Sequence, residues 1–384
     1  MSRFFRKNIA ALAGYVPGEQ PGGEQHVIKL NTNENPYPPS PRVFAALRQA
    51  LNRSLRLYPE PLTDSLRAVA ASVYGVKPEN ILAGNGSDEI LSIITRCFVG
   101  AHDRVAFPVP TYSLYDTLIA IQEGERITVD YPSDFSLPEA LASQQAALTL
   151  VCNPNSPSGT LVPLQDIERL ARTVSGILVI DEAYVDFAES EGASSLPLIR
   201  NFPNLIVLRT FSKSFSLAGM RIGLAFASEE MILGMMKVKD SYNLNRLSAI
   251  AATAALRDVR WMAGNIARIQ RSRRQLTAGL RKTGFEVYPS EANFVMARKK
   301  GEDLKGAYEK LKRKRILVRY FDVPGLRDCL RITVGTPQEI RSLLKEIKLF
   351  ETIRQRNLFL KKRRQNGAHK SYRIGPHCPQ RRRH

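Results

Sequence analysis

The sequence predicts an α/β protein whose main sheet is mostly parallel and flanked by helices, with a smaller α+β domain after it. Three apolar, β-branched runs, at 149–155, 177–184 and 204–211, are typical of buried strands. A helical pattern at 164–174 separates the first two runs, and strands that alternate with helices indicate parallel pairing. Because ligands of such sheets bind at the carboxyl ends of the strands, we expect a site where these runs end.

The pattern changes after Gly223, where short strands and helices follow one another without the earlier alternation. This change predicts a second, smaller domain of the α+β class. The predicted elements are helices at 231–258 and 261–283, strands within 285–298, 315–321 and 329–335, a helix at 303–313 and a last helix from 337 to about 353.

These patterns predict four segments of the chain. They are an N-terminal arm at 1–46 that joins the small domain, a large domain at 47–259, a small domain at 260–350 and a basic tail at 351–384. The tail has eleven Lys and Arg against one acidic residue, so it carries +10 of the net charge of +20. We expect the tail to be disordered, because so polar a segment buries too little surface to fold alone. Binding of an acidic partner is an alternative interpretation of the tail.

Composition also narrows the class of protein. No run of about 18 apolar residues occurs, so we expect no membrane partner. The four cysteines, Cys97, Cys152, Cys329 and Cys378, have neither metal-site nor disulfide spacing, which predicts a cytoplasmic protein without a metal. The positive charge would also suit a non-catalytic nucleic-acid-binding protein on a similar fold. We expect no nucleic-acid partner, because the tail has few aromatic side chains to stack on bases.

Two motifs in the first half of the large domain are compatible with a bound anion and a flat ring. In GNGSDE, at 84–89, a glycine turn precedes a helix that begins near Ser87 and Asp88, and such an N-terminus binds phosphate through backbone N–H groups. A capped helix without a ligand is the simpler interpretation. In PTYSLY, at 110–115, Tyr112 follows a short strand and could stack on a ring. Core packing would explain Tyr112 equally well.

Two further motifs lie at the ends of predicted strands. NPNSPSG, at 153–159, places Asn155 and Ser156 where they can donate neutral hydrogen bonds. Asp181 ends a run too apolar for an unpaired carboxylate, so it needs a cation or a protonated ring nitrogen as its partner. Tyr184 follows three residues later and could point its phenol at the same ligand. The alternative is that Asp181 caps the turn that follows it.

The segment RTFSKSFSLAGMRIG, at 209–223, adds an amine and further phosphate donors. Lys213 follows a strand next to that of Asp181, and burial would lower its pKa and leave a nucleophilic amine. Side chains suited to a phosphate surround it, namely Thr210, Ser212 and Arg221. An aldehyde on a protonated ring that bears a phosphate satisfies all these groups, which predicts pyridoxal 5′-phosphate as the cofactor.

The ordered motifs GNGSDE, PTYSLY, NPNSPSG, DEAYVDF, SKSFSLAGMRIG and CLRITVG resemble those of the fold-type-I pyridoxal phosphate aminotransferases. Within that family, LNTNENPYPPSP near the start and CLRITVGTPQE near the end are similar to the histidinol-phosphate branch. The resemblance covers about residues 25–350. It implies a homodimer with two sites at the subunit interface.

The resemblance implies roles for matching positions around the cofactor. Lys213 would form the Schiff base and move the proton of the substrate Cα, and Asp181 would pair with the ring nitrogen. Tyr184 would bond the ring O3′ together with Asn155 or Ser156, and Tyr112 would stack on the ring. The implied phosphate contacts are the backbones of Ser87 and Asp88, the side chains of Thr210 or Ser212, Arg221, and Tyr58 from the other subunit.

The resemblance also implies a substrate site and shows three departures. Arg331, helped by Arg319, would bind the anionic groups of both substrates, with Asn33 and Tyr37 in the substrate loop. Ser156 stands where the family more often has Asn, so the partner of the ring oxygen stays open. Pro38 replaces the more common Gly and stiffens the loop. The tail matches no segment of the family.

The implied function is transamination between histidinol phosphate and 2-oxoglutarate, giving imidazole acetol phosphate and glutamate, in histidine biosynthesis. The alternatives within the family are an aminotransferase acting on aromatic amino acids and a decarboxylase acting on threonine phosphate. An assay of several amino donors with 2-oxoglutarate would separate the first two, and release of carbon dioxide would reveal the third.

Overall fold

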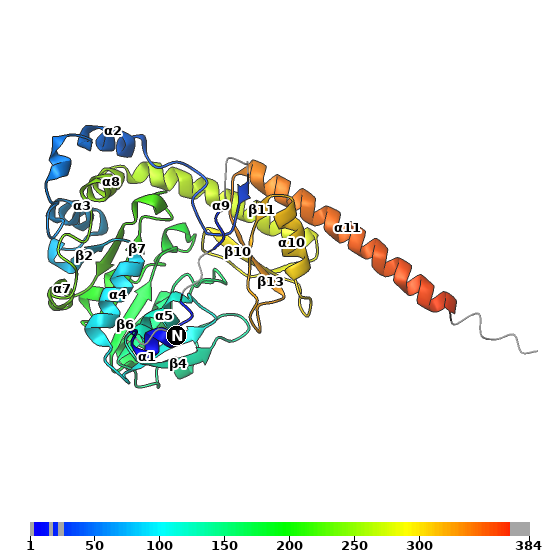
Figure 1. The fold of residues 1–384 in the computed structure, drawn as a ribbon, viewed down its shortest axis with the longest axis horizontal. Coiled ribbons are helices and arrows are strands. Elements are labelled where there is room, and N and C mark those ends of the chain that lie inside the picture. The colour runs from blue at the N-terminus through cyan, green and yellow to red at the C-terminus, as the bar shows by residue number, and fades with distance from the viewer. Residues whose placement is uncertain (1–3, 15–17, 22–26, 369–384) are drawn as a thin grey trace, which may run out of the picture.

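The computed structural model describes residues 4–14, 18–21 and 27–368, with side chains described as far as 352. In Figure 1 a large sheet with its helices forms one part of the molecule, and a smaller sheet with α9, α10 and α11 forms the other. The short α1 (Lys7–Ala11) lies on the large part, where the Asn8 side chain donates to the carbonyls of Ala120 and Ile121 at 3.0 and 3.3 Å.

The large sheet has seven strands in the order β2-β8-β7-β6-β5-β3-β4. Only β8 runs antiparallel to its neighbours, β2 and β7, so the prediction of a mostly parallel sheet is confirmed. The strands are β2 (Ile81–Gly84), β3 (Arg104–Val109), β4 (Glu125–Asp130), β5 (Leu148–Cys152), β6 (Ile177–Asp181), β7 (Leu205–Thr210) and β8 (Gly223–Phe226).

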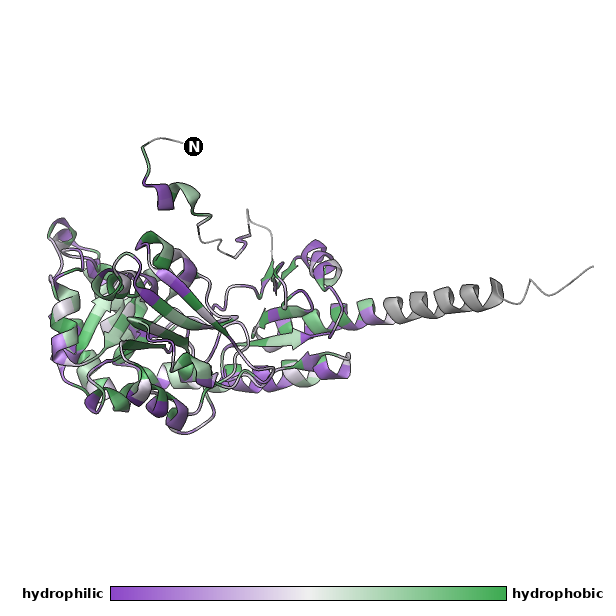
Figure 2. Ribbon diagram, turned by 90° about the horizontal axis from the view of Figure 1, so that it is seen from below, coloured by the Kyte–Doolittle hydropathy of each residue, from purple (hydrophilic) through white to green (hydrophobic). Residues whose placement is uncertain are grey.

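Helices cover both faces of this sheet, as the strand sequences require. Leu178 and Ile180 of β6 pack into one hydrophobic cluster, and Val179 between them packs into another on the opposite face. Figure 2 shows the corresponding hydrophobic interior, with hydrophilic residues on the outer helix surfaces. The helices are α2 (Pro41–Ala50), α3 (Asp64–Tyr74), α4 (Ser87–Phe98), α5 (Leu114–Ile121), α6 (Leu164–Thr173), α7 (Glu229–Met236) and α8 (Arg246–Leu256).

The small sheet is antiparallel, with the order β12-β13-β10-β9. Its strands are β9 (Glu286–Val287), β10 (Phe294–Arg298), β12 (Arg319–Tyr320) and β13 (Cys329–Thr333), flanked by α9 (Val259–Lys282) and α10 (Lys305–Arg313). A separate parallel pair joins β1 (Ile28–Lys29) to β11 (Ile316–Leu317), so the N-terminal segment lies against the later part of the chain. The four segment boundaries given above remain predictions.

Three element predictions differ from the structure. The helix predicted at 231–258 is interrupted, because α7 ends at Met236 and the Asn245 side chain caps α8 by accepting from the Ser248 N–H at 2.8 Å. The runs 285–298 and 315–321 each contain two short strands rather than one.

The last helix is longer than the sequence analysis predicted. α11 spans Pro337–Ala368, so the expected end near 353 and the expected disorder from 351 are wrong as far as Ala368. The segment 351–366 contains Arg, Lys, Gln, Leu and Glu, which favour helices, and neither Gly nor Pro. The rest of the predicted tail, 369–384, lies outside the described residues. Among the described residues, no helix has both the length and the apolar character needed to cross a membrane.

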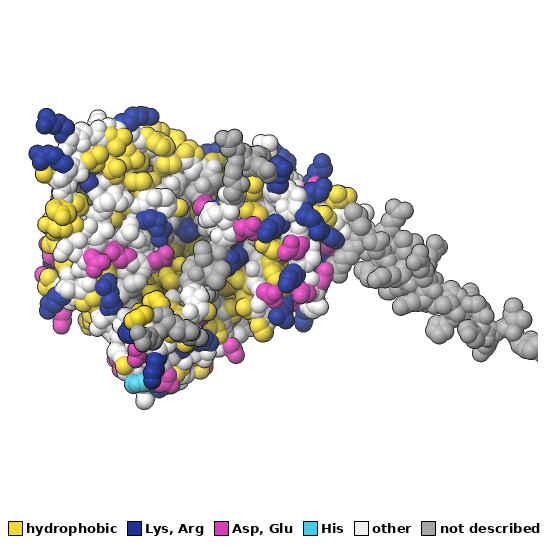
Figure 3. All heavy atoms as spheres, viewed as in Figure 1, with side chains coloured by type: hydrophobic (Ala, Val, Ile, Leu, Met, Phe, Trp, Pro, Cys, Tyr) yellow, Lys and Arg dark blue, Asp and Glu magenta, His cyan; other side chains and the backbone are white. Residues whose placement is uncertain are grey.

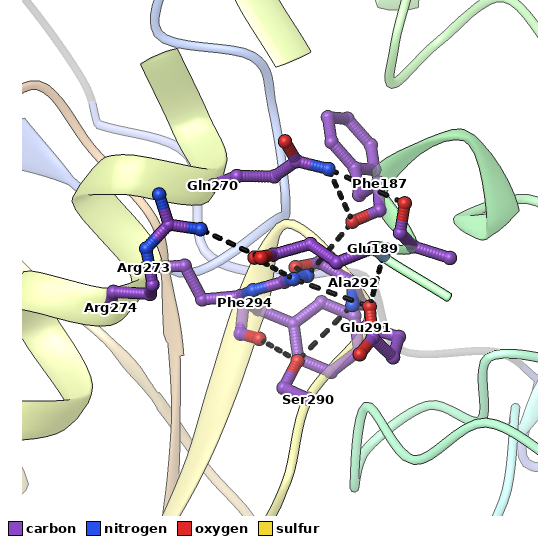
Figure 4. Close-up of polar contacts among 10 residues, drawn as sticks. Phe187, Glu189, Gln270, Arg273, Arg274, Ser290, Glu291, Ala292 and Phe294 are labelled. Carbon is purple, nitrogen blue, oxygen red and sulfur yellow. Dashed lines mark hydrogen bonds and ion pairs between the residues drawn. The ribbon is translucent and has the colours of Figure 1, made fainter. Parts of the chain in front are cut away.

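A buried arginine joins the large and small parts of the fold (Figure 4). The Arg273 side chain on α9 is only 5% exposed and donates to the carbonyls of Phe187 at 3.1 Å and Ala292 at 2.9 Å. It also pairs with the carboxylates of Glu189 at 2.9 Å and Glu291 at 3.3 Å. Phe187 follows β6, and Ala292 precedes β10, so one guanidinium holds both sheets to α9.

We expect Arg273→Gln to lower the free energy of unfolding by about 3 kcal/mol, because it removes a buried charged donor from two carboxylates and two carbonyls. Arg274 provides a matched control, since it also pairs with Glu189, at 2.7 Å, but its side chain is 59% exposed. Arg274→Gln should lower the free energy by less than about 1 kcal/mol. Urea unfolding of the two variants measures both values, and equal losses would contradict the assignment of Arg273 as the joining residue.

Candidate active site

A cavity of about 1090 Å³ opens at the carboxyl ends of the large sheet's strands and reaches the small sheet. Thirteen of the sixteen predicted site residues line it, although they come from segments far apart in the chain. They are Asn33, Ser87, Asp88, Tyr112, Ser156, Asp181, Tyr184, Thr210, Ser212, Lys213, Arg221, Arg319 and Arg331. The structure therefore brings these residues together at the strand ends, and their roles remain predictions.

Lys213 lies just beyond the end of β7 and presents an amine to the cavity. Its Nζ donates to the Thr32 carbonyl at 3.2 Å, and the Asn35 side chain donates to the Lys213 carbonyl at 3.0 Å. Burial, together with the positive charge of Arg331, lowers the pKa of Lys213 to about 8. About a tenth of the amine is therefore neutral and nucleophilic at pH 7, far more than for an ordinary lysine. Thr32 and Asn35 were not among the predicted residues.

Asp181 ends β6 at the floor of the cavity, with 3% of its surface exposed. Its carboxylate accepts hydrogen bonds from the Tyr115 hydroxyl and from the Ala183 N–H, each at 3.2 Å. Burial raises the pKa of Asp181 to about 6. In the part of the chain whose side chains are described, no cation forms an ion pair with Asp181. This carboxylate is therefore available to a proton-bearing group of a ligand.

Tyr115 is the main polar contact of Asp181 that the sequence analysis missed. It lies one residue into α5 and only 1% of its surface is exposed. Its ring packs edge-on against Tyr112 with centroids 5.7 Å apart. The motif PTYSLY contained both tyrosines, but Tyr115 also fits the apolar pattern of a helix face, so its hydroxyl gave no signal of its own.

An anion cradle lies where α4 begins beside the connection from β7 to β8. Gly86 precedes α4 with φ of 87°, a conformation that favours glycine, and a Cβ there would press on the Arg221 guanidinium 2.6 Å away. Arg221 itself has φ of 50°, in the left-handed region that non-glycine residues rarely adopt. Its guanidinium lies 3.4 Å from the Ser212 hydroxyl, and Thr210 lines the same wall. Helix N–H groups, hydroxyls and a guanidinium together suit a phosphate.

Asp88 places a carboxylate at the edge of this cradle. It forms an ion pair with Arg221 at 3.0 Å and accepts from the Tyr112 hydroxyl at 3.1 Å. A phosphate would therefore use the backbone of Asp88 and share Arg221 with its side chain. The same contact holds the Tyr112 ring at the cavity wall, where it can lie against a flat ligand.

Tyr184 and Asn33 form a second polar wall. The Asn33 side-chain amide donates to the Tyr184 hydroxyl at 3.1 Å, and the Thr333 hydroxyl donates to the Asn33 side-chain oxygen at 3.0 Å. Burial raises the pKa of Tyr184 to about 12, so the phenol keeps its proton and can donate it in a hydrogen bond. Thr333 ends β13, so this wall joins the two sheets.

Arg331 extends from the small sheet and contacts a loop of the large sheet. It lies on β13, and its guanidinium donates to the Ser156 hydroxyl at 3.0 Å and to the Asn31 carbonyl at 3.1 Å. Its ζ-carbon lies 5.3 Å from the centre of the Phe294 ring. Arg319 pairs with Arg331 in register on the neighbouring strand β12. Two guanidiniums on this side of the cavity can bind an anionic substrate group.

Three predicted residues do not line the cavity. The Asn155 side chain is occupied inside its loop, where its amide donates to Pro110 and Ser158 and its oxygen accepts from Thr111. Ser156, not Asn155, therefore faces the cavity. Tyr37 is buried in the core of the small part, with the Arg268 guanidinium 3.5 Å from its ring centre.

Tyr58 is the third residue outside the cavity, since 77% of its surface is exposed and its ring stacks on Tyr242 at 4.6 Å. The resemblance implied that Tyr58 reaches the site of a neighbouring subunit, and an exposed side chain is compatible with that role. Within this chain Tyr58 contacts no cavity residue among those described above.

The cavity fits the expected cofactor. An anion cradle, an unpaired carboxylate and an amine of lowered pKa lie around one space, which matches the phosphate, ring nitrogen and aldehyde of pyridoxal 5′-phosphate. Within the described residues, no group of three His, Cys, Asp or Glu side chains could hold a metal ion.

Comparison with known families identifies the chain. The family described as "Aminotransferase class I and II" matches residues 25–347. The chain belongs to this family. The match spans the whole of both sheets, so the aminotransferase assignment rests on nearly all of the fold and not on a single motif.

Relatives of this aminotransferase align along almost their full length. It is 45% identical over 349 residues to histidinol-phosphate aminotransferase 1 of Trichormus variabilis, covering 91% of this chain and 99% of the relative. It is 44% identical to histidinol-phosphate aminotransferase of Syntrophotalea carbinolica, covering 88% and 97%.

A solved structure with the same fold is that of histidinol-phosphate aminotransferase from Sinorhizobium meliloti in complex with pyridoxal 5′-phosphate. It matches this aminotransferase with a TM-score of 0.84 and 27% identity, covering 92% of this chain and 98% of that one. L-threonine-O-3-phosphate decarboxylase from Porphyromonas gingivalis matches with a TM-score of 0.76 and 25% identity, covering 84% and 99%. The predicted fold class is confirmed.

Proposed function

We propose that this aminotransferase exchanges the amino group between histidinol phosphate and 2-oxoglutarate, as a step of histidine biosynthesis. The main support for this proposal is the full-length similarity, at 44 and 45% identity, to relatives named for this substrate. The cavity supports the proposal, because Arg331 and Arg319 line it from the small sheet, whereas the cofactor cradle belongs to the large part of the fold. A substrate with an anionic group on a short stem would place its amine toward Lys213.

The residues of this chain supply distinct parts of the reaction. Pyridoxal 5′-phosphate, when bound, supplies an aldehyde that takes up amino groups and a ring that accepts electrons. Arg221, Ser212 and the N-terminus of α4 would hold its phosphate. Asp181 would keep a proton on the ring nitrogen, and Lys213 would move the proton at the substrate Cα. The lowered pKa of Lys213 suits that role, since a neutral amine accepts a proton.

Remaining cavity residues would orient the cofactor and the substrate. Tyr184 and Ser156 can bond the ring oxygen, and Tyr112 would lie against the ring face. Arg331 would bind the carboxylate of glutamate in one half-reaction and the phosphate of histidinol phosphate in the other. Asn33 would act indirectly, by holding the Tyr184 phenol in place.

A panel of amino donors tests the substrate assignment directly. Histidinol phosphate, phenylalanine, tyrosine and threonine phosphate are each supplied with 2-oxoglutarate, and glutamate and carbon dioxide are both measured. We expect glutamate from histidinol phosphate at the highest kcat/KM and no carbon dioxide. Faster transfer from phenylalanine or tyrosine would replace the proposal with an aromatic aminotransferase. Carbon dioxide from threonine phosphate would favour the decarboxylase, which the similarity to the Porphyromonas gingivalis structure makes a specific alternative.

We expect Arg331→Ala to raise the KM for both glutamate and histidinol phosphate by about 10- to 100-fold, because a charged hydrogen bond to each anion is lost. The pKa of Lys213 should also rise, since Arg331 is one of the charges that lower it. Arg313→Ala is a suitable control, because Arg313 is exposed on α10 and does not line the cavity. An unchanged KM for glutamate in Arg331→Ala would rule out a shared anion site.

We further propose that the enzyme is a homodimer located in the cytoplasm. Large hydrophobic side chains are exposed along the segment from α2 to α3, including Leu51 at 62%, Leu57 at 51% and Tyr58 at 77%. Figure 3 shows hydrophobic side chains gathered over the surface around α2. Such a patch is typical of a protein interface. The described cysteines, Cys97, Cys152 and Cys329, are free thiols, as a reducing compartment would allow. Sedimentation at twice 43.0 kDa, and cell fractionation, test these two points.

A further inference from the structure

A buried ion-pair network lies behind the cavity, between β6 and β7. Arg209 on β7 has a side chain that is 10% exposed, and its Nη1 donates to the Asp186 carboxylate at 2.6 Å. Its Nε lies 3.2 Å from the carboxylate of Glu182, whose side chain is fully buried. One guanidinium therefore holds two carboxylates that follow the end of β6.

This network and the cavity occupy opposite faces of the sheet. Successive side chains of a strand point to opposite faces, so Glu182 points away from the cavity that Asp181 enters. On β7 the same holds for Arg209 and Thr210, of which only Thr210 lines the cavity. The network therefore contacts neither the cofactor space nor a substrate, and any effect on the reaction must pass through the backbone.

The network nevertheless reaches the residue next to Lys213. The Ser214 hydroxyl donates to the second carboxylate oxygen of Asp186 at 2.5 Å. From the other side, the Asn35 amide donates to the carbonyls of Lys213 and Ser214 at 3.0 and 3.2 Å. The backbone that carries the reactive amine is thus held between Asn35 and the Arg209 network.

Hydrogen bonds satisfy the carboxylate of Glu182 as well. It accepts from the Ser194 hydroxyl at 2.8 Å and from the Ser195 N–H at 2.5 Å. Burial would lower the pKa of Arg209, but Asp186 and Glu182 outweigh that effect and hold the pKa above its ordinary range. Arg209 therefore stays charged. A buried network of this kind, in which one guanidinium pairs with two carboxylates, fixes a single backbone arrangement.

We propose that Arg209, Glu182 and Asp186 form a positioning network that fixes the segment bearing Lys213 against the strand bearing Asp181. The inference rests on the proposed function, because it takes Lys213 and Asp181 as the residues that act on the cofactor. Loss of the Asp186–Ser214 contact would free this segment on one side. The Lys213 amine would then gain contact with water and behave more like an ordinary lysine.

Two serine variants separate this positioning role from a general effect on folding. Ser214→Ala removes the hydroxyl that bonds Asp186. Ser195→Ala removes an equally buried hydroxyl whose oxygen has no hydrogen-bond partner among the described residues, while the Ser195 N–H bond to Glu182 remains. The two variants are matched in residue type and in burial.

The measurement is the pH dependence of Lys213 acylation in the full-length chain without cofactor, followed by mass spectrometry of the peptide that contains it. The wild-type chain should give a midpoint near pH 8. Ser214→Ala should raise the midpoint by about half a unit or more toward the ordinary lysine value, and Ser195→Ala should leave it unchanged. Asp186→Asn should shift it in the same direction as Ser214→Ala.

Two outcomes would overturn the proposal. An unchanged midpoint in Ser214→Ala would show that the network does not position Lys213, and an equal shift in Ser195→Ala would show only general loosening. Acylation needs neither substrate nor cofactor, so it stays informative if histidinol phosphate donates no amino group in the donor panel. Absence of amino transfer from histidinol phosphate would reject the proposed substrate, and the acylation result would still test the positioning network.

Discussion

Replacing Lys213 with Ala is expected to reduce amino transfer by about 10⁴-fold or more, because the variant lacks both the amine that takes the cofactor aldehyde and the base at the substrate Cα. The fold should remain, since within the described residues the Lys213 amine donates a single hydrogen bond, to the Thr32 carbonyl. Steady-state rates with histidinol phosphate measure the loss, and circular dichroism checks the fold.

A chemical rescue and a control make this result specific. Added methylamine should restore part of the activity of Lys213→Ala, because the deleted side chain leaves room for a small base. Lys237→Ala should behave as wild type, since Lys237 is exposed and does not line the cavity. Retention of normal transfer by Lys213→Ala would remove Lys213 from the mechanism.

The second large effect is expected for Asp181→Asn, which should lower kcat by about 10³-fold and yet stabilise the cofactor-free protein at pH 7. The amide cannot hold a proton on the ring nitrogen by its charge. It also avoids burying an unpaired carboxylate, and Asp181 is only 3% exposed. The gain in the free energy of unfolding should approach about 3 kcal/mol at pH 7.

The pH dependence of this gain follows from the raised pKa. Asp181 has a pKa of about 6 in the folded chain against 3.8 in the unfolded one, so the folded chain binds more protons between those values. Its contribution to stability is fully present below pH 3.8 and is lost as the pH rises through about 6. Urea unfolding of both proteins at pH 4 and pH 7 measures the difference. A gain that is equal at the two pH values would mean that the carboxylate is not the cause.

The parts of the fold that could be predicted from the sequence are those in which burial dictates composition. The strands β5, β6 and β7 are buried on both faces and therefore read as continuous apolar runs. The interruption between α7 and α8 has no such signal, because residues 237–245 contain neither Gly nor Pro. The start of α8 depends on the Asn245 cap, a hydrogen bond that the sequence pattern did not predict.

In the site as well, features that depend on neighbouring residues could be predicted, and features that depend on residues distant in sequence could not. Motifs placed thirteen residues at the cavity because each follows a strand or begins a helix. Tyr37 does not line the cavity of this chain, because it packs against Arg268, which is remote in sequence, and its substrate-binding role remains a prediction. The choice between Asn155 and Ser156 depended on contacts of Asn155 with Pro110 and Thr111, which the NPNSPSG motif itself does not contain.

The antiparallel position of β8 beside β7 has one more consequence. Lys213 and Arg221 both lie on the connection between these two strands, which is closed by the Phe211 N–H bond to the Ile222 carbonyl at 3.0 Å. The two residues proposed to hold the cofactor, Lys213 through its amine and Arg221 through its charge, thus belong to a single hairpin. A protease that cut at the exposed Gly219 would sever one anchor from the other, and a bound vitamin would bridge the gap. Resistance to cleavage at Gly219 would then show that the cofactor is bound, without any measurement of enzyme activity.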